Sequence, residues 1–244
     1  MTIRTLVVGN RWAMNVVKAL RLGVFLPLVA WRWMNNRRGG SDPRRRTWFV
    51  DLGAYDGDSA LKAMEWYPGA YGFVLFEPGI EQFNILQRRF AGNLRVKLNR
   101  AAAGTENRTG APLYHGTRFG HAGDSLQAAK SNVSPHAAER VEIIDFSDYL
   151  RSAFSAEDDI ILKVDVEGTE YGILEKLIAD GTIGRVRKMY CEWHGDRVAV
   201  PVSQHSGLVR KLNSLGFDLV GVNRFDEFHQ QHNNGTYWSL GVRR

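Results

Sequence analysis

The segment Asp51-Leu-Gly-Ala-Tyr-Asp-Gly57 decides the fold of this chain. It ends the apolar run of residues 48–52, which suits a buried strand of a parallel sheet. Beyond the turn, Asp58 or Ser59 can cap a helix that runs to about Tyr67. Because ligands of open α/β sheets bind outside the carboxyl ends of the strands, we expect this strand-to-helix turn to face a cleft.

Strands and helices alternate along the rest of the chain. A second apolar strand over residues 72–77 is followed by a helix that begins at Pro78 and runs to Phe90, and residues 94–99 form a third strand. Residues 104–140 are polar and lack a sustained period, which predicts a long excursion with one hairpin, a type of segment that usually carries function. Further strands are predicted at residues 141–144, 159–166, 186–193, 217–222 and 237–242, and further helices at residues 146–151, 170–179 and 204–215. This order predicts an α/β fold with a mostly parallel sheet, helices on both faces and an antiparallel hairpin at one edge.

The positive charge of the chain is concentrated at its N-terminus. The 244 residues carry a formal net charge of +6, but residues 1–46 alone hold ten basic residues and one acid, a balance of +9. The other 198 residues hold 22 basic and 25 acidic residues, a balance of −3. We therefore divide the chain into a basic, partly apolar extension and linker, residues 1–46, and a mildly acidic main domain, residues 47–244. This distribution does not favour nucleic acid as the partner of the main domain.

The extension contains an apolar run, residues 22–31, between Arg21 and Arg32. A membrane-spanning helix needs about 20 apolar residues, so this run is too short to span a bilayer. Residues 11–35 are expected to pack as an amphipathic segment or to lie on an anionic membrane surface; a cleaved signal is a third, weaker interpretation, since no small-residue cleavage site follows. The single cysteine, Cys191, excludes an internal disulfide and fits a reducing compartment. We expect a cytoplasmic protein, with contact to the membrane surface left open.

The glycine turn has the wrong spacing for a dinucleotide and the right charge for a cationic ligand. A pyrophosphate site has the pattern G-x-G-x-x-G, whereas here Gly53 and Gly57 lie four residues apart. The turn also carries Asp51 and Asp56, whose carboxylates repel phosphate. S-adenosylmethionine (SAM), with its sulfonium and ammonium groups, fits such a turn. Glu77, 20 residues beyond Gly57, can accept hydrogen bonds from both hydroxyls of a ribose and can cap the next helix as well.

Neighbouring positions are expected at the same cofactor site. The predicted strand of residues 94–99 ends where the adenine of SAM would lie, and this placement is inferred only from the position of the strand in the sheet. The residues added on these grounds are Ala54, Tyr55, Asp58, Pro78, Asn99 and Ala101.

Carboxylates also gather where the strand of residues 159–166 ends. Asp165, Glu167 and Glu170 lie within six residues, which is more than capping requires, although Glu170 alone suits the helix dipole. Lys163 alternates with Asp165 along the strand, so both can face one side. Lys163 either pairs with an acid or faces the reaction site.

A histidine at the end of the next strand completes the predicted reaction site. Glu192 and His194 are separated by one residue and therefore point the same way. We expect Asp165, Glu167, His194 and Lys163 to be the catalytic residues. A base such as Asp165 or His194 would take the proton of a hydroxyl, while a cluster of this kind can also hold Mg²⁺, which would polarise the hydroxyl. We favour the metal-free form.

Three blocks of the sequence resemble the FkbM family of SAM-dependent methyltransferases. They are Phe49-Val-Asp-Leu-Gly-Ala-Tyr-Asp-Gly-Asp58, Phe76-Glu-Pro78 and Leu162-Lys-Val-Asp-Val-Glu-Gly-Thr-Glu-Tyr171. The resemblance covers about residues 47–194 and implies a Rossmann-like class I methyltransferase fold with a seven-stranded sheet. It also implies that the glycine turn and Glu77 bind SAM and that residues 163–170 line the reaction site. The family methylates oxygens of sugars and polyketide-type products, so the expected acceptor is a hydroxyl of a small molecule, sugar or glycolipid.

Three other functions are weighed against O-methylation. An N- or C-methyltransferase would share the fold, but a general base suits oxygen best. A nucleic-acid methyltransferase could use the basic N-terminus to bind phosphate. A noncatalytic scaffold would have no need of the intact set Asp51, Gly53, Gly57 and Glu77. Residues 1–46 and 104–140 lie outside the family's motifs, as do the turn residues Tyr55 and Asp56, where an Asn-x pair is expected.

Overall fold

The computed structural model describes residues 45–117, 123–221 and 237–243. These belong to one compact unit that begins at residue 43. The predicted extension of residues 1–46, including the segment of residues 11–35 expected to contact a membrane, lies almost entirely outside the described residues. Within the described ranges, no helix is both long and apolar enough to cross a bilayer.

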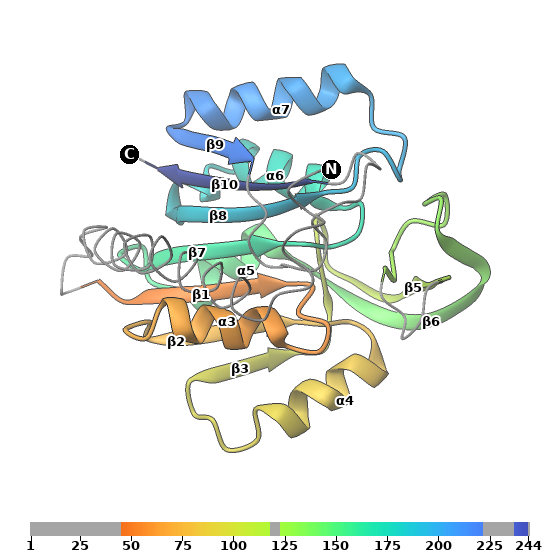
Figure 1. The fold of residues 1–244 in the computed structure, drawn as a ribbon, viewed down its shortest axis with the longest axis horizontal. Helices are drawn as coiled ribbons and strands as arrows, with labels where there is room; N and C mark the ends of the chain where they lie inside the picture. Colours follow the sequence, from red (N-terminus) through yellow and green to blue (C-terminus); the bar gives the residue numbers. More distant parts are fainter. Residues whose placement is uncertain (1–44, 118–122, 222–236, 244) are drawn as a thin grey trace, which may run out of the picture. The chain divides into compact units, whose positions relative to one another are not determined.

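The main sheet has seven strands in the order β3-β2-β1-β7-β8-β10-β9 (Figure 1). Its strands are β1 (Thr47–Leu52), β2 (Gly72–Phe76), β3 (Val96–Asn99), β7 (Asp159–Val164), β8 (Val186–Trp193), β9 (Phe217–Gly221) and β10 (Tyr237–Arg243). β3, β2, β1, β7 and β8 pair in parallel, while β10 is antiparallel to both β8 and β9. The predicted sheet and its closing hairpin are confirmed.

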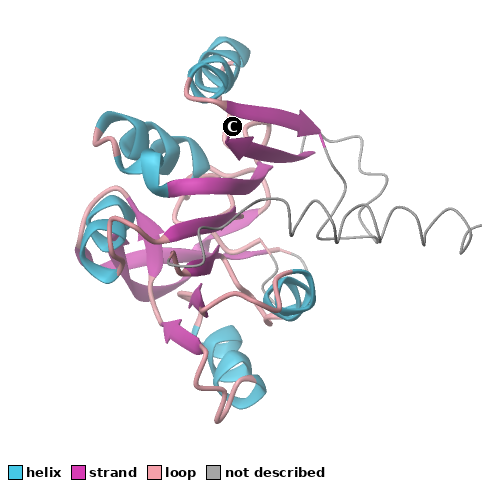
Figure 2. Ribbon diagram, turned by 90° about the vertical axis from the view of Figure 1, so that its left-hand side faces the viewer, coloured by secondary structure: helices cyan, strands magenta, loops and turns pink. Residues whose placement is uncertain are grey.

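Helices cover both faces of this sheet (Figure 2). The helices are α3 (Asp58–Trp66), α4 (Ile80–Arg89), α5 (Phe146–Ala153), α6 (Glu170–Ala179) and α7 (Val202–Ser214), with a short 3₁₀ helix, η2, at Thr182–Arg185. In β1, Phe49 packs with the apolar residues of α3 and α4, whereas Val50 packs with those of α5, α6 and α7. Successive strand residues point to opposite faces, so each strand supplies both cores.

Three helices begin at different residues from those predicted, and one of them, α7, begins at Val202 and not at residue 204. α3 begins at Asp58 after Gly57, which has a positive φ of 91°, and neither Asp58 nor Ser59 caps it with its side chain. The Ser59 hydroxyl instead donates to Asp51. α4 begins at Ile80 and not at Pro78, because the Gly79 N–H is held by the Glu77 side chain and Gly79 has extended backbone.

The polar excursion forms a second, three-stranded sheet, in the order β4-β6-β5. Its strands are β4 (Ala102–Gly104), β5 (Arg108–Gly116) and β6 (Val133–Asp145). The expected hairpin is the antiparallel pair β5–β6, but residues 141–144 are the end of the 13-residue β6 and not a separate strand. Most of β5 is not buried, so its sequence lacks the apolar alternation that marks a strand. The hairpin lies beyond the carboxyl ends of β1 and β7 (Figure 1).

Candidate functional site

The turn between β1 and α3 is packed against the end of β7 so closely that a side chain cannot fit. A Cβ atom at Gly53 would lie 1.8 Å from the carbonyl oxygen of Asp165, and Gly53 has a positive φ of 84°. Tyr55 also has a positive φ, 50°, a conformation in which asparagine or glycine is common and a bulky residue rare. This explains why an asparagine was expected near this position. The backbone of the turn is therefore fixed by its neighbours.

Glu77 holds that turn from the neighbouring strand. Its Oε2 accepts the N–H of Tyr55 and its Oε1 accepts the N–H of Gly79, both at 2.8 Å. The residue is only 7% exposed, and this burial raises its pKa to about 8, although the two N–H groups act in the opposite direction. A carboxylate can accept about four hydrogen bonds, so Glu77 keeps acceptor capacity for a ligand.

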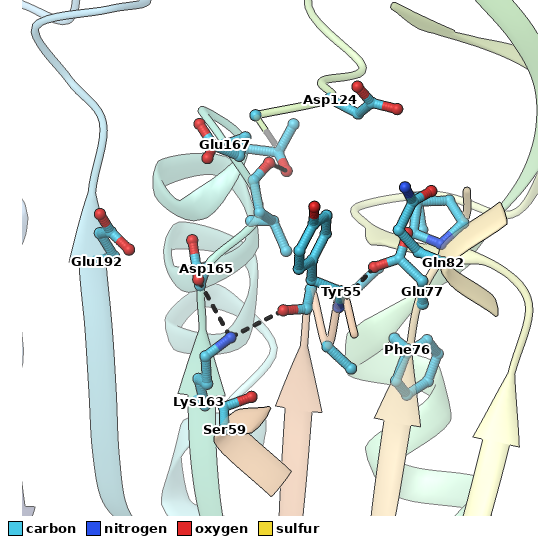
Figure 3. Close-up of a pocket in the computed structure, with 18 of the residues that line it drawn as sticks. Tyr55, Ser59, Phe76, Glu77, Gln82, Asp124, Lys163, Asp165, Glu167 and Glu192 are labelled. Carbon is cyan, nitrogen blue, oxygen red and sulfur yellow. Dashed lines mark hydrogen bonds and ion pairs between the residues drawn. The ribbon is translucent and has the colours of Figure 1, made fainter. Parts of the chain in front are cut away.

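Lys163 links β7 to the glycine turn. Its ammonium lies 2.9 Å from Asp51 Oδ1. It also lies 2.8 Å from the carbonyl oxygen of Gly53 and 3.2 Å from Asp165 Oδ2 (Figure 3). Burial favours the neutral amine, but the two carboxylates outweigh it and keep the pKa of Lys163 above its ordinary value. Lys163 therefore remains a cation. Asp51, which is fully buried, faces this cation and Ser59, and does not line the cavity described below.

Asp165 and Glu192 present carboxylates from β7 and β8 on the same side of the sheet (Figure 3). Burial raises the pKa of Asp165, but Lys163 and His194 outweigh it and leave the pKa below its usual range. Burial and the nearby Asp165 charge raise the pKa of Glu192 to about 8. The two neighbouring carboxyl groups thus hold their protons with different strengths, which is a common property of reaction sites.

Glu167 lies at the tip of the turn between β7 and α6, with a positive φ of 54°. Its Oε2 contacts Lys130 at 2.6 Å and Arg197 at 3.4 Å. Two side chains of the segment between β5 and β6 hold the backbone of this turn. The Ser125 hydroxyl donates to the carbonyl oxygen of Glu167 at 2.7 Å, and the Gln127 amide donates to that of Gly168 at 2.5 Å.

His194 lies behind this turn and is 1% exposed. Its Nδ1 is 2.7 Å from Glu170 Oε1, and its Nε2 is 3.3 Å from Glu167 Oε2 and 3.7 Å from Glu192 Oε1. Neither of the Nε2 contacts has hydrogen-bond geometry. Burial lowers the pKa of His194, but the hydrogen bond to Glu170 and the surrounding carboxylates raise it to about 9. Glu170 also accepts the N–H of Gly168, so it does more than complement the helix dipole.

These elements surround a cavity of about 560 Å³, a size typical of small-molecule sites. Most of the predicted cofactor residues line it, as do three of the four predicted catalytic residues. The predicted residues at its wall are Gly53, Ala54, Tyr55, Asp58, Glu77, Pro78, Ala101, Lys163, Asp165 and Glu167. Asp51, Gly57, Asn99 and His194 do not line it. Asn99 instead turns its side chain toward the carbonyl oxygen of Leu75, at 3.4 Å.

The wall of this cavity is strongly acidic. Seven acidic residues and three basic residues line it, a formal balance of −4 when every acid is ionised, although the pKa values of Glu77 and Glu192 are raised to about 8. Five of the charged residues at the wall were not predicted as site residues: Asp56, Lys62, Asp124, Glu192 and Arg197. Glu192 carried a signal, because it alternates with His194, whereas Asp124 and Arg197 lie in segments without a pattern. An acidic cavity attracts a cation and repels phosphate.

Comparison with known families identifies one match. The family model described as the methyltransferase FkbM domain matches residues 51–219, more than half of the chain. Among curated proteins, no sequence matches this chain.

Solved structures resemble this chain at low sequence identity. The FkbM methyltransferase of Methylobacillus flagellatus KT is 15% identical with a TM-score of 0.51, over 82% of this chain and 45% of its own length. This chain therefore spans less than half of that relative. The precorrin-6y C5,15-methyltransferase of Geobacter metallireducens GS-15 is 11% identical, with a TM-score of 0.41 and 87% of each chain covered. The N-terminal domain of human METTL16 in complex with SAH is 13% identical, with a TM-score of 0.43, over 89% of this chain and 69% of that one. The predicted Rossmann-like class I methyltransferase fold is confirmed.

Proposed function

Because this chain belongs to the FkbM methyltransferase family, we propose that it transfers the methyl group of SAM to a hydroxyl oxygen of a small molecule, a sugar or a glycolipid. The observation that carries the proposal is the joining of two sets of residues at one cavity. The glycine turn and Glu77 lie at one part of its wall, and the carboxylates of Asp165 and Glu192 lie at another. The cavity thus offers a place for the donor beside a place for proton transfer.

The residues of the turn fit SAM in charge and in hydrogen-bonding capacity. SAM supplies an electrophilic methyl group on a positively charged sulfur. The formal balance of −4 at the wall suits this cationic ligand and disfavours a diphosphate. Glu77 already accepts two backbone N–H groups, and its remaining lone pairs suit the two hydroxyls of a ribose. In this proposal, the backbone of Gly53, Ala54 and Tyr55 contacts SAM. Ala101 and Pro78 make apolar contacts with it.

The proton of the acceptor hydroxyl goes to a carboxylate at the cavity wall. Asp165 is paired with Lys163 at 3.2 Å, whereas the nearest ion-pair contact of Glu192 is to His194 at 3.7 Å. Glu192 is therefore the less engaged of the two and is the proposed base, with Asp165 orienting the acceptor. Lys163 acts as a positioning residue, since its ammonium is already shared among three oxygens of the chain. A carboxylate base favours an oxygen acceptor over an amine, which is nucleophilic without one.

The charge of the cavity argues against nucleic acid as the acceptor. Phosphates would meet the carboxylates of Asp124, Glu167 and Glu192 at the wall. We therefore keep a small molecule, sugar or glycolipid as the proposed acceptor and a cytoplasmic location as the proposed compartment. Contact between residues 11–35 and a membrane surface stays part of the proposal, and it would favour a glycolipid.

One experiment in two arms tests the proposal. Calorimetry with the full chain measures SAM binding, and incubation with methyl-labelled SAM and fractionated host metabolites, lipids and glycans, followed by mass spectrometry, identifies the product. We expect saturable SAM binding and a labelled methyl ether. Absence of SAM binding by folded protein would refute the proposal, and a label found on nitrogen or on RNA would replace the acceptor class.

A further inference from the structure

His194 has one ring nitrogen without a hydrogen-bond partner, although it is buried among carboxylates. Nε2 is inaccessible to solvent, and it has no hydrogen bond within the described residues. A buried polar atom without a partner costs free energy, so such atoms in folded proteins usually indicate a water, an ion or a ligand. This nitrogen faces Glu167 at 3.3 Å and Glu192 at 3.7 Å.

Two carboxylates lie close to this imidazole. One ligand atom each from Asp165, Glu167 and His194 can be chosen so that all three lie within 4.8 Å of one another. The three residues come from the end of β7, from the turn that follows it and from the residue after β8. We propose that Asp165, Glu167 and His194 bind a divalent metal ion at the wall of the cavity.

Glu170 gives the histidine the orientation that a metal ligand needs. Its Oε1 lies 2.7 Å from His194 Nδ1, and Glu170 itself is fixed by the N–H of Gly168 at 3.0 Å. Metal-binding histidines usually donate their second ring nitrogen to a carboxylate in this way, which fixes the tautomer and leaves the other lone pair for the ion. The side chain of His194 cannot turn to another partner, because it is 1% exposed and packed in place.

Acidic side chains outnumber basic ones around the histidine. The group joined by ion pairs contains five carboxylates and three basic side chains, which leaves a formal balance of −2 when the imidazole is neutral. Its members are Asp51, Asp165, Glu167, Glu170, Glu192, Lys130, Lys163 and Arg197. Uncompensated charge is costly where water is excluded. A surrounding rich in carboxyl groups favours a cation beside the imidazole.

The donor atoms indicate which ion binds. One imidazole nitrogen with two carboxylate oxygens is a mixed set, which suits Mn²⁺ or Zn²⁺, whereas Mg²⁺ and Ca²⁺ prefer oxygen ligands alone. Three ligands from the chain leave coordination positions open toward the cavity, because Asp165 and Glu167 line its wall. An open position is typical of a catalytic rather than a structural metal site.

The chemical use of the ion rests on the proposed function. A divalent cation beside Glu192 would lower the pKa of a coordinated acceptor hydroxyl and hold it at the cavity wall. The binding of the ion itself does not depend on methyl transfer, so the two proposals can fail separately.

Metal binding is measured with the full chain, freed of metal by a chelator, and without SAM or acceptor. Mn²⁺ is titrated and followed by electron paramagnetic resonance of the free ion, and Zn²⁺, Mg²⁺ and Ca²⁺ are compared by calorimetry. We expect one Mn²⁺ or Zn²⁺ per chain, with Mg²⁺ and Ca²⁺ bound at least about 10-fold more weakly. Bound metal should also raise the melting temperature.

Variants locate the ion. H194Q should weaken Mn²⁺ binding by more than about 100-fold, and E170Q, which replaces the carboxylate partner of Nδ1, by about 10- to 100-fold. H136Q is the matched control, since it removes an exposed imidazole from β6, and it should bind as the wild type does. E167Q, at the partly exposed tip of the turn, repeats the test should H194Q fail to fold.

Each result decides the proposal. Equal Mn²⁺ binding by wild type, H194Q and E167Q would overturn it, as would the absence of Mn²⁺ and Zn²⁺ binding at millimolar concentrations, which would leave His194 as a buried cation of the fold. Calorimetry with SAM on the same sample separates the two proposals. Normal SAM binding without metal binding refutes the metal site alone, and metal binding without SAM binding refutes the methyl donor alone.

Discussion

The ammonium group of Lys163 lies 2.9 Å from Oδ1 of Asp51, its register partner on the neighbouring parallel strand. Both side chains are almost completely removed from solvent, with 3% and 0% exposed. The pair lies directly under the glycine turn, because the same ammonium also donates to the carbonyl oxygen of Gly53 and contacts the carboxylate of Asp165. One buried cation therefore ties together the two strands that carry the site.

Removal of this cation should destabilise the fold. K163M leaves the carboxylates of Asp51 and Asp165 without their buried partner, and the loss of one member of a buried pair costs about 3–5 kcal/mol. Urea denaturation measures the change in the free energy of unfolding. K176M is the control, because Lys176 pairs with Asp145 and Asp180 in a more exposed position and should have a far smaller effect. Equal losses in the two variants would contradict a special role for Lys163.

Replacement of Glu77 by alanine should weaken SAM binding more than ten-fold. The contacts to two ribose hydroxyls are worth roughly 1.5–3 kcal/mol, since hydrogen bonds to a charged group are strong. Calorimetry with E77A measures the loss, and E81A, on the neighbouring helix, controls for a change in surface charge. Unchanged SAM affinity in folded E77A would exclude Glu77 from the donor site.

The stability of the protein should depend on pH through the same carboxyl group. The pKa of Glu77 rises from 4.5 to about 8 on folding. A group whose pKa is raised by folding stabilises the fold fully below the lower value, and this contribution is lost as the pH rises through the higher one. The free energy of unfolding should therefore fall between about pH 5 and about pH 9, and the fall should be smaller in E77Q. Parallel pH profiles of the two proteins would show that Glu77 does not titrate in this way.

Glu192 should be needed for methyl transfer and not for donor binding. E192Q keeps the shape of the side chain but cannot take a proton, so we expect the rate of methylation to fall by about 10²- to 10⁴-fold, the usual contribution of a general base. SAM affinity should stay close to that of the wild type. The rate is measured with labelled SAM and the acceptor fraction identified by mass spectrometry, and E65Q, at an exposed position of α3 outside the cavity wall, is the control. Near-normal turnover of E192Q would move the role of the base to another residue.

The sequence predicted those parts of the molecule that follow from hydrophobic pattern and local turns. The buried strand of residues 186–193 and the helix of residues 170–179 are found at their predicted bounds, because each has a continuous apolar signal. β5 and the first part of β6 were predicted only as a hairpin without bounds, since much of their length is exposed and polar. Pattern methods detect burial, and these strands bury little.

The same limit applies to the site. The turn residues and Glu77 were predicted because strand ends of a parallel sheet meet at one edge. Lys130 was not predicted as a site residue, because its partner Glu167 lies 37 positions away in the sequence. The two side chains meet only when the segment between β5 and β6 has folded. The hydrogen bonding of His194 also could not be predicted from the sequence. It depends on side-chain geometry that Nδ1 pairs with Glu170 and that Nε2 makes no hydrogen bond within the described residues.

The hydrogen bonds from Ser125 and Gln127 to the backbone of the turn at Glu167 and Gly168 have a consequence for changing the acceptor. Substrate range in such enzymes could be altered by transplanting the segment between β5 and β6 from one homologue to another. A graft that lacks these two donors would loosen the very turn that carries Glu167, and its loss of activity could be mistaken for a poor choice of substrate. Chimeras of this protein should therefore retain both positions and exchange only the residues around them.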